Sequence, residues 1–330
     1  MKKERHWKRF SLLVISFTVV LWGMNAGASV SWAAEKYPDR PVNMIVGFSP
    51  GGASDLGSKI IADKVSEFLG QPLVATYKPG GGGTLSASYV AKAKPDGYTT
   101  LVMVSFMNLP PEVKKLDYKL DDFVLTGLWG RAPYFIIVKA DAKWKTLKDF
   151  VEDAKKNPGK LTYGSAGVNT GGHFVGTLLE KQAGIKLTHV PFKSCADALT
   201  AMMGGHVSAY ICVGIGEAKD TATQRTLATA EQERLEGLEE IPTVAELGWP
   251  VYFSTWYTFA FPKGTPDRIV DTFSKAQQKA IEKYKKEITQ NLNRVNMWPS
   301  FGAPQGAVKE FKNQYNVIRE IMKETSPEKK

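Results

Sequence analysis

The stretch Phe48-Ser-Pro-Gly-Gly-Ala-Ser-Asp55 lies between an apolar run over 42–47 and an amphipathic segment over 56–69. This order predicts a strand, a tight turn and a helix. Glycine lets the backbone turn without interference from a Cβ atom, and the first N–H groups of the helix then point away from the end of the strand. Such a helix start attracts anions. No Gly-Lys-Ser/Thr follows Gly51-Gly52, so the stretch is not a P-loop.

Apolar, β-branched runs alternate with helical periodicity along the rest of the chain. The alternation predicts an α/β fold with a largely parallel sheet. One series covers 42–104 and a similar one begins near residue 134, so we expect two lobes. The predicted strands are 42–48, 73–76, 99–104, 134–138, 161–163, 187–191, 207–213 and 252–261, and the predicted helices are 54–69, 84–92, 147–156, 172–183, 196–203, one after 266 and one around 311–322.

The chain begins with a basic segment and continues with an uncharged, apolar segment over 11–34. This pattern predicts a secretory signal peptide over 1–34, with cleavage near Ala33 or Ala34 because Ser31 and Ala33 are small. An uncleaved membrane anchor is the alternative, although polar and glycine residues dilute the second half of the segment. Removal of five basic residues and one acidic residue lowers the net charge from +10 to +6. We expect an exported, periplasmic protein.

Several other functions lack support in the sequence. The lysines are scattered over predicted helix surfaces rather than interleaved with aromatic residues, so we expect no nucleic-acid partner. His6, His173, His189 and His206 share no ligand spacing, so we expect no metal and no cofactor. The order around Ser165 misses the first glycine of a Gly-x-Ser-x-Gly elbow, and no acid and histidine follow in the usual order. We therefore predict that the protein is not an enzyme.

The glycine-rich or hydroxyl-rich helix start occurs at three further places. In open α/β sheets, ligands collect at the carboxyl edge of the strands, where such starts lie. We expect starts from both predicted lobes to face one cleft. The three stretches are Tyr163-Gly-Ser-Ala-Gly-Val-Asn-Thr-Gly-Gly-His173, Lys78-Pro-Gly-Gly-Gly-Gly-Thr84 and Phe192-Lys-Ser-Cys-Ala-Asp197.

Taken in order, the motifs of this chain resemble those of the periplasmic receptors of tripartite tricarboxylate transporters, also called Bug receptors. The resemblance spans nearly the whole chain after the leader. It implies a two-lobed periplasmic-binding-protein (Venus flytrap) fold, each lobe a mixed, mostly parallel sheet flanked by helices. The motifs are Tyr37-Pro-x-Arg-Pro-Val42, Phe48-x-Pro-Gly-Gly-x-x-Asp55, Pro79-Gly-x-Gly-Gly83, Pro95-Asp-Gly-Tyr-Thr99, Pro158-Gly-Lys-Leu-x-Tyr-Gly-Ser-x-Gly167 with His173, His189-Val-Pro-Phe-Lys193, Ile241-Pro-Thr-Val-Ala-Glu-Leu-Gly248 and Pro262-x-Gly-Thr-Pro266.

The resemblance also implies a function. Two lobes would close over a small organic mono- or dicarboxylate, with room for an aromatic acid, and present it to the integral-membrane permease of the transporter. We expect a monomer with lobe I over 35–136 and 253–330 and lobe II over 137–252, joined by strands that act as a hinge. A sensing receptor that feeds a signalling partner is the main alternative. A serine hydrolase that uses Ser165 is the remote one.

In receptors of this type, backbone N–H groups and hydroxyls of two loops hold the carboxylate. Asp55 is expected either to orient the first loop or to meet a polar group of the ligand. We expect His173 to be a buried hydrogen-bonding residue rather than a titrating group. The predicted ligand-binding residues are Phe48, Pro50, Gly51, Gly52, Ala53, Ser54, Asp55, Ser105, Ser165, Ala166, Asn169, Thr170, His173, Ser194 and Cys195.

The sequence departs from the family pattern where Ser194 and Cys195 replace the usual glycine. The far end of the pocket is therefore expected to differ from that of relatives. Cys195 opens a predicted helix and Cys212 ends the next strand, so a right-handed crossover brings both to the same edge of the sheet. A disulfide between them is geometrically possible in an exported protein, and the sequence leaves the pairing open.

Overall fold

Two long strands connect the parts of the molecule that carry the glycine-rich loops. The computed structural model describes residues 36–214 and 222–325, and the predicted signal peptide lies outside them. The residues from Pro38 onward form one compact unit. Its strands follow the order β2-β1-β3-β9-β4-β7-β5-β6, and β8 pairs with β4 beside this path.

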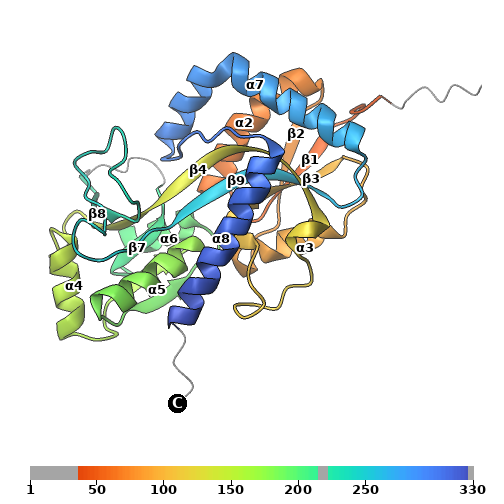
Figure 1. Cartoon of the computed structure of the whole chain (residues 1–330). Coiled ribbons are helices and arrows are strands. Elements are labelled where there is room, and N and C mark those ends of the chain that lie inside the picture. Colours follow the sequence, from red (N-terminus) through yellow and green to blue (C-terminus); the bar gives the residue numbers. More distant parts are fainter. Residues whose placement is uncertain (1–35, 215–221, 326–330) are drawn as a thin grey trace, which may run out of the picture. The chain divides into compact units, whose positions relative to one another are not determined.

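The first part of the sheet is parallel except for β9. β1 pairs with β2 and β3 in parallel, and β9 pairs antiparallel with β3. Helix α2 packs against the long helix α7 (Figure 1). The elements here are β1 (Val42–Val46), α2 (Ala53–Leu69), β2 (Leu73–Tyr77), η1 (Gly81–Gly83), α3 (Thr84–Ala91), β3 (Thr99–Val104), η2 (Ser105–Met107), η3 (Leu120–Asp122), β9 (Ser254–Pro262), α7 (Asp267–Arg294) and α8 (Pro304–Thr325).

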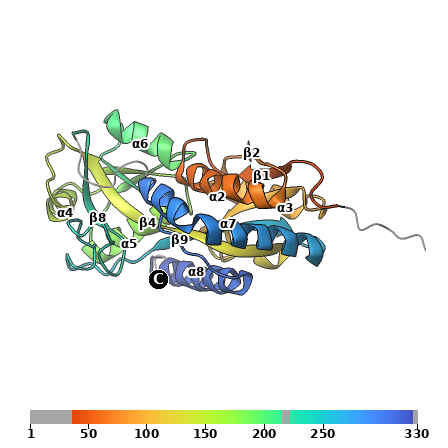
Figure 2. The same ribbon diagram turned by 90° about the horizontal axis from the view of Figure 1, so that it is seen from above.

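The second part repeats this plan around the short strands β5, β6 and β7. β5 pairs in parallel with β6 and β7, while β7 and β8 pair antiparallel with β4. Helix α8 contacts β4 and reaches α5 (Figures 1 and 2). The elements are β4 (Phe123–Lys139), α4 (Leu147–Lys156), β5 (Thr162–Ser165), α5 (Gly171–Ala183), β6 (Thr188–Pro191), α6 (Cys195–Met203), β7 (Ala209–Val213) and β8 (Gln224–Thr229).

Strand β4 changes partners partway along its length. Phe123 to Pro133 face β9, whereas Tyr134 to Lys139 face β7 and β8. The predicted lobe boundaries near 136 and 252 lie close to this change and to the start of β9, and the two-lobe division itself stays a prediction.

Two parts of the strand prediction were wrong. The sequence predicted only 134–138 of β4, because Gly127, Gly130 and Pro133 disfavour a strand. Pairing with β9, interrupted by register shifts, carries the strand through them. β8 was missed because Gln224, Arg225 and Thr226 make its first half polar, and its pairing with β4 decides the conformation.

Helix ends were predicted to within one residue at most places because local chemistry sets them. Gly70 ends α2 at φ 77°, a left-handed conformation that glycine adopts readily. Thr146 and Asp149 form a capping box at the start of α4. The core beneath the long strands is aromatic, with Trp129 packed against Tyr257 and Phe259 at ring separations of 5.0 and 5.8 Å.

Candidate functional site

The starts of α2, α5 and α6 meet around a small inner chamber of about 20 Å³. This is about the room that one water molecule needs. The N-cap residues Gly52 of α2 and Thr170 of α5 make no side-chain hydrogen bond to the N–H groups of the first turns. These N–H groups supply the partial positive charge of the chamber. Eight predicted residues line it: Phe48, Gly52, Ala53, Ser54, Ala166, Thr170, Ser194 and Cys195.

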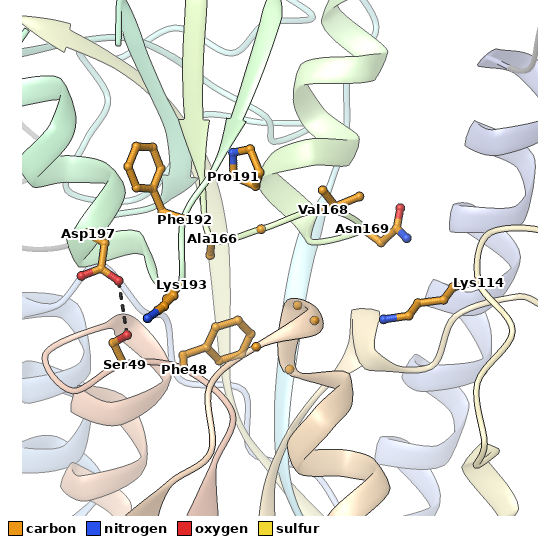
Figure 3. A pocket seen from close by; sticks show the side chains of 15 residues that line it. Phe48, Ser49, Lys114, Ala166, Val168, Asn169, Pro191, Phe192, Lys193 and Asp197 are labelled. Carbon is orange, nitrogen blue, oxygen red and sulfur yellow. Dashed lines mark hydrogen bonds between the residues drawn. The ribbon is translucent and has the colours of Figure 1, made fainter. Parts of the chain in front are cut away.

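A larger outer cleft of about 900 Å³ adjoins the chamber. The two cavities share the lining residues Phe48 and Ala166, so they lie next to each other. Among the predicted residues, Asn169 also lines the cleft (Figure 3). The volume of the cleft lies within the range of small-molecule sites, roughly 300 to 1,000 Å³.

Asp55 holds the first loop from within. Its Oδ2 accepts a hydrogen bond from the Gly51 N–H at 2.8 Å, and its Oδ1 accepts one from the Tyr77 hydroxyl at 2.9 Å. Lys59 Nζ lies 2.9 Å from Oδ1, and the hydrogen bonds to Tyr77 and Asp55 raise the pKa of Lys59. Asp55 is 1% exposed and lines neither cavity. The structure therefore favours the loop-orienting role over direct ligand contact.

Neutral side chains hold the second loop. Ser165 Oγ lies 2.7 Å from His189 Nε2 and also donates a hydrogen bond to the Gly167 carbonyl at 3.1 Å. The His189 ring packs on Tyr163 and on His173. His173 Nδ1 in turn accepts a hydrogen bond from the Asn169 N–H at 3.3 Å. This chain of contacts fixes the loop that ends in the start of α5.

The histidine pair is neutral at pH 7. Burial, followed by repulsion from His173, lowers the pKa of His189 to about 4. Burial also lowers the pKa of His173. Because a protonated His173 could not accept the Asn169 hydrogen bond at Nδ1, the neutral state is the one that supports the loop.

Helix α6 is fixed to the chamber by a cap and a covalent bond. Ser194 Oγ accepts a hydrogen bond from the Asp197 N–H at 3.2 Å. A disulfide joins Cys195 at the start of α6 to Cys212 at the end of β7, with a Cα–Cα distance of 5.9 Å. The disulfide forms part of the chamber wall.

Two contacts cross between the loop regions on either side of the cleft. Ser49 Oγ donates a hydrogen bond to Asp197 Oδ2 at 3.2 Å (Figure 3). At Gly82, whose φ is 67°, a Cβ atom would lie 2.9 Å from the Val168 carbonyl oxygen. Glycine is therefore required where these two loops approach each other.

Several predicted residues do not reach either cavity. Pro50 and Gly51 are exposed on the outside of the first loop. The buried Ser105 accepts a hydrogen bond from the Trp256 N–H at 3.1 Å, which uses its hydroxyl inside the strand layer. Six predicted residues line neither the chamber nor the cleft, and their contact with a ligand stays a prediction: Pro50, Gly51, Asp55, Ser105, Ser165 and His173.

Other lining residues were not among the predicted set. The stretches 48–55, 78–84, 163–173 and 192–197 had been recognised as helix starts, and this was the available signal for Ser49, Gly80 to Gly83, Gly167, Val168, Gly172, Phe192, Lys193 and Asp197. The remaining residues lie outside these stretches, and distant strands and turns bring them to the site. These are Lys114 and Pro191 in the cleft and Phe106, Tyr134, Cys212, Val213 and Tyr257 in the chamber.

The structure offers little for catalysis. Ser165 is fully buried and lines neither cavity, so its hydroxyl cannot meet a substrate there. Within residues 36–214 and 222–325, no three His, Cys, Asp or Glu residues cluster in a way that could hold a metal ion.

In the same residues, no helix is both long and apolar enough to cross a membrane.

The comparison with known families identifies the chain. Residues 58–326 match the model of the TctC family, described as the tripartite tricarboxylate transporter family receptor. The chain belongs to this family. The predicted family is thereby confirmed, and because its members are solute-binding receptors, so is the prediction that the protein is not an enzyme.

Individual TctC-family proteins agree with this assignment. A Cupriavidus necator protein named for the gbd 5' region is 32% identical over 252 residues, which cover 76% of this chain and 77% of the relative. The structure of the periplasmic binding protein BugD has 27% identity and a TM-score of 0.81, and covers 88% of this chain and 98% of BugD.

A second solved structure, of an R. palustris protein with adipate, has 27% identity and a TM-score of 0.82 over 88% of this chain and 98% of that one. These likenesses confirm the predicted periplasmic-binding-protein fold. The protein is thus a TctC-family periplasmic solute-binding protein.

Proposed function

We propose that this protein captures a small organic carboxylate between the starts of α2, α5 and α6 and delivers it to the membrane permease of a tripartite tricarboxylate transporter. The observation that carries the proposal is the convergence of three helix starts on one chamber in a chain of the TctC family. Backbone N–H groups at such starts stabilise an anion without a dedicated arginine.

Two further observations support a carboxylate. Hydroxyl side chains accompany the N–H groups in the chamber wall, with Ser54 from α2, Thr170 before α5 and Ser194 before α6. In this conformation the hydroxyls of Thr170 and Ser194 donate to the Gly167 carbonyl and to Asp197, so they would have to turn toward a bound carboxylate. A related receptor of R. palustris was solved with adipate, a dicarboxylate. A carboxylate with several good hydrogen-bond donors binds without a counter-ion.

Transport requires that the site open and close. The chamber has room for about one water molecule in this conformation, so an organic acid needs the two sides to separate before it enters. We assign residues 35–136 and 253–330 to one lobe and 137–252 to the other, with β4 and β9 as the hinge. A ligand that contacts both lobes favours the closed form, which is the form the permease would accept.

A thermal-shift screen of organic acids on the exported protein, followed by calorimetry, tests the proposal. A bound acid should raise the melting temperature by mass action. Ala166→Phe, which adds a ring at a position that lines both cavities, should abolish the shift. Ala142→Phe, in the turn between β4 and α4, is the control and should leave it intact.

Two results would count against the proposal: no acid that binds the wild-type protein, or equal affinity in the Ala166→Phe variant. A sensing receptor remains the alternative function and would bind the same acids. Reconstituted uptake with the permease distinguishes the two, since only a transport receptor would stimulate it.

A further inference from the structure

A groove of about 690 Å³, which we call the rear groove, is lined by residues 230–236 and 252–254 and by single residues of β4, β9, α8 and the segment before α8. It lies on the other face of the strand pair β4 and β9 from the chamber. Trp256 of β9 lines the groove, whereas the next residue, Tyr257, lines the chamber, and successive side chains of a strand point to opposite faces. Arg131 of β4, which pairs with Trp256, also lines the groove.

The helices agree with this placement. Figure 2 shows α6, whose start lines the chamber, above β4 and β9, and α8, which contributes two residues to the rear groove, below them. The strand pair therefore separates the chamber from the groove.

Large apolar side chains of the rear groove are open to solvent. Tyr252 is 40% exposed and Val317 is 42% exposed, and Trp256 and Trp298 are half-buried beside them. Tryptophan, tyrosine and arginine are the residues most enriched at the centres of protein–protein interfaces. The rear groove thus has the composition of a surface that binds another polypeptide.

The edge of the rear groove is acidic. Its two arginines, Arg131 and Arg234, each form an ion pair with a glutamate. Glu233 and Glu236 are exposed and make no hydrogen bond or ion pair within residues 36–214 and 222–325. Carboxylates and aromatic rings both attract a cation, so this edge is complementary to lysine or arginine side chains. It stands on a chain whose formal net charge is +10.

The rear groove also spans the hinge. Residues 230–236 belong to the part of the chain that we assign to the second lobe, and the groove residues of β4, β9 and α8 belong to the first. Arg131 Nη1 joins the two parts, because it donates hydrogen bonds to Glu231 Oε2 at 2.6 Å and to Ser254 Oγ at 2.8 Å. A rotation of the lobes about β4 and β9 would move residues 230–236 relative to Trp298, so the shape of the groove would follow the opening of the site.

We propose that the rear groove is a docking site for a segment of the membrane permease that carries basic side chains beside an apolar one. The inference rests on the proposed function, which makes the permease the partner that must distinguish the open form from the closed form. The basic side chains pair with the carboxylates of Glu233 and Glu236. The apolar side chain packs against Trp256 and Trp298.

Charge reversal at the edge tests the docking site. Uptake of the acid that gives the largest thermal shift is measured in vesicles that contain the permease, as the concentration of acid-loaded receptor is varied. Glu233→Lys/Glu236→Lys should raise the half-saturating receptor concentration about tenfold at low ionic strength and by less at high ionic strength, because salt screens charges at the rim of an interface. Calorimetry should give an acid affinity within about twofold of wild type, since neither residue lines the chamber or the cleft.

Two further variants separate docking from net charge. Glu152→Lys/Asp271→Lys makes the same change of charge at exposed positions of α4 and α7 outside the rear groove, and should leave the half-saturating concentration within about twofold of wild type. Tyr252→Ala should raise this concentration about fivefold at both ionic strengths, because it removes a ring and no charge.

The inference is overturned if either rear-groove variant matches the wild-type half-saturating concentration, or if the control variant loses as much as Glu233→Lys/Glu236→Lys. In both cases the loaded wild-type protein still stimulates uptake, so the proposed function survives. If the loaded wild-type protein does not stimulate uptake, both proposals fail together.

Discussion

The two loops that face the inner chamber are anchored by different chemistry. The first loop is tied down by a buried carboxylate, Asp55, which has a cation and two hydrogen-bond donors as partners. The second depends on neutral groups, with Ser165 bonded to His189 and His173 receiving the Asn169 N–H. Similar helix starts can therefore be positioned by an ionic or by an uncharged network, and the two should respond differently to pH and substitution.

Glycines at the two helix starts also differ in how closely their neighbours surround them. A Cβ atom at Gly172 in α5 would lie 2.1 Å from the Ile211 carbonyl oxygen, whereas one at Gly51 would meet nothing within 4 Å. The disulfide adds a covalent constraint on the side of the second loop. The helix start at Gly172 is therefore enclosed by neighbouring backbone, whereas the first loop has free space at Gly51.

Removal of the disulfide should have the largest effect on stability. Cys195→Ser/Cys212→Ser should lower the free energy of unfolding by about 3 kcal/mol, because the bond closes a loop between residues 17 positions apart. Urea denaturation measures this. Reductant should destabilise the wild-type protein by a similar amount and leave the double variant unchanged. An equal effect of reductant on both proteins would show that the stability difference does not come from the disulfide.

Matched glycine substitutions compare the packing directly. Gly172→Ala should cost about 2 to 3 kcal/mol, because the new methyl group meets a backbone oxygen that cannot move away cheaply. Gly51→Ala should cost about 1 kcal/mol, since only its φ of 78° opposes alanine. Urea denaturation of the two variants in parallel tests this difference. Equal losses of unfolding free energy in the two variants would show that the packing around the two glycines does not differ in its effect.

The ionic anchor is tested at Asp55. Asp55→Asn should lower the free energy of unfolding by about 1.5 kcal/mol, because it weakens the charged hydrogen bonds to Lys59 and the Gly51 N–H. It should also weaken acid binding by loosening the first loop. Asp63→Asn, on an exposed position of the same helix, should change neither property. Unaltered affinity in Asp55→Asn would show that the loop keeps its shape without the anchor.

The neutral anchor should make stability depend on pH. The pKa of His189 is about 4 in the folded protein and near 6.5 when unfolded, so the unfolded chain binds more protons between these values. Stability due to neutral His189 is complete above pH 6.5 and is lost as the pH falls toward 4. Melting temperatures across this range should fall less steeply in His189→Gln than in the wild-type protein. Parallel curves for the two proteins would mean that His189 does not contribute to the pH dependence of stability.

Part of the site could be predicted because it is local in sequence. The residues at the starts of α2 and α6 that line the chamber were found from glycine, serine and hydroxyl-rich stretches that follow strands. Helix ends such as Gly70 and the Thr146 cap were likewise set by neighbouring residues. The roles of Asp55 and Ser165 were not determined in this way, because their partners Tyr77 and His189 lie on other strands.

The sequence by itself determined the alternation of strands and helices, the glycine-bearing turns and the family, since these depend on short-range pattern and backbone freedom. Tertiary structure alone decided which of those turns face the chamber, which polar side chains serve as internal anchors, and that Lys114 stands at the cleft. It also decided that β4 continues through two glycines and a proline. The physical reason is that cavities, buried hydrogen bonds and strand pairing depend on partners distant in the chain, whose positions follow only from packing.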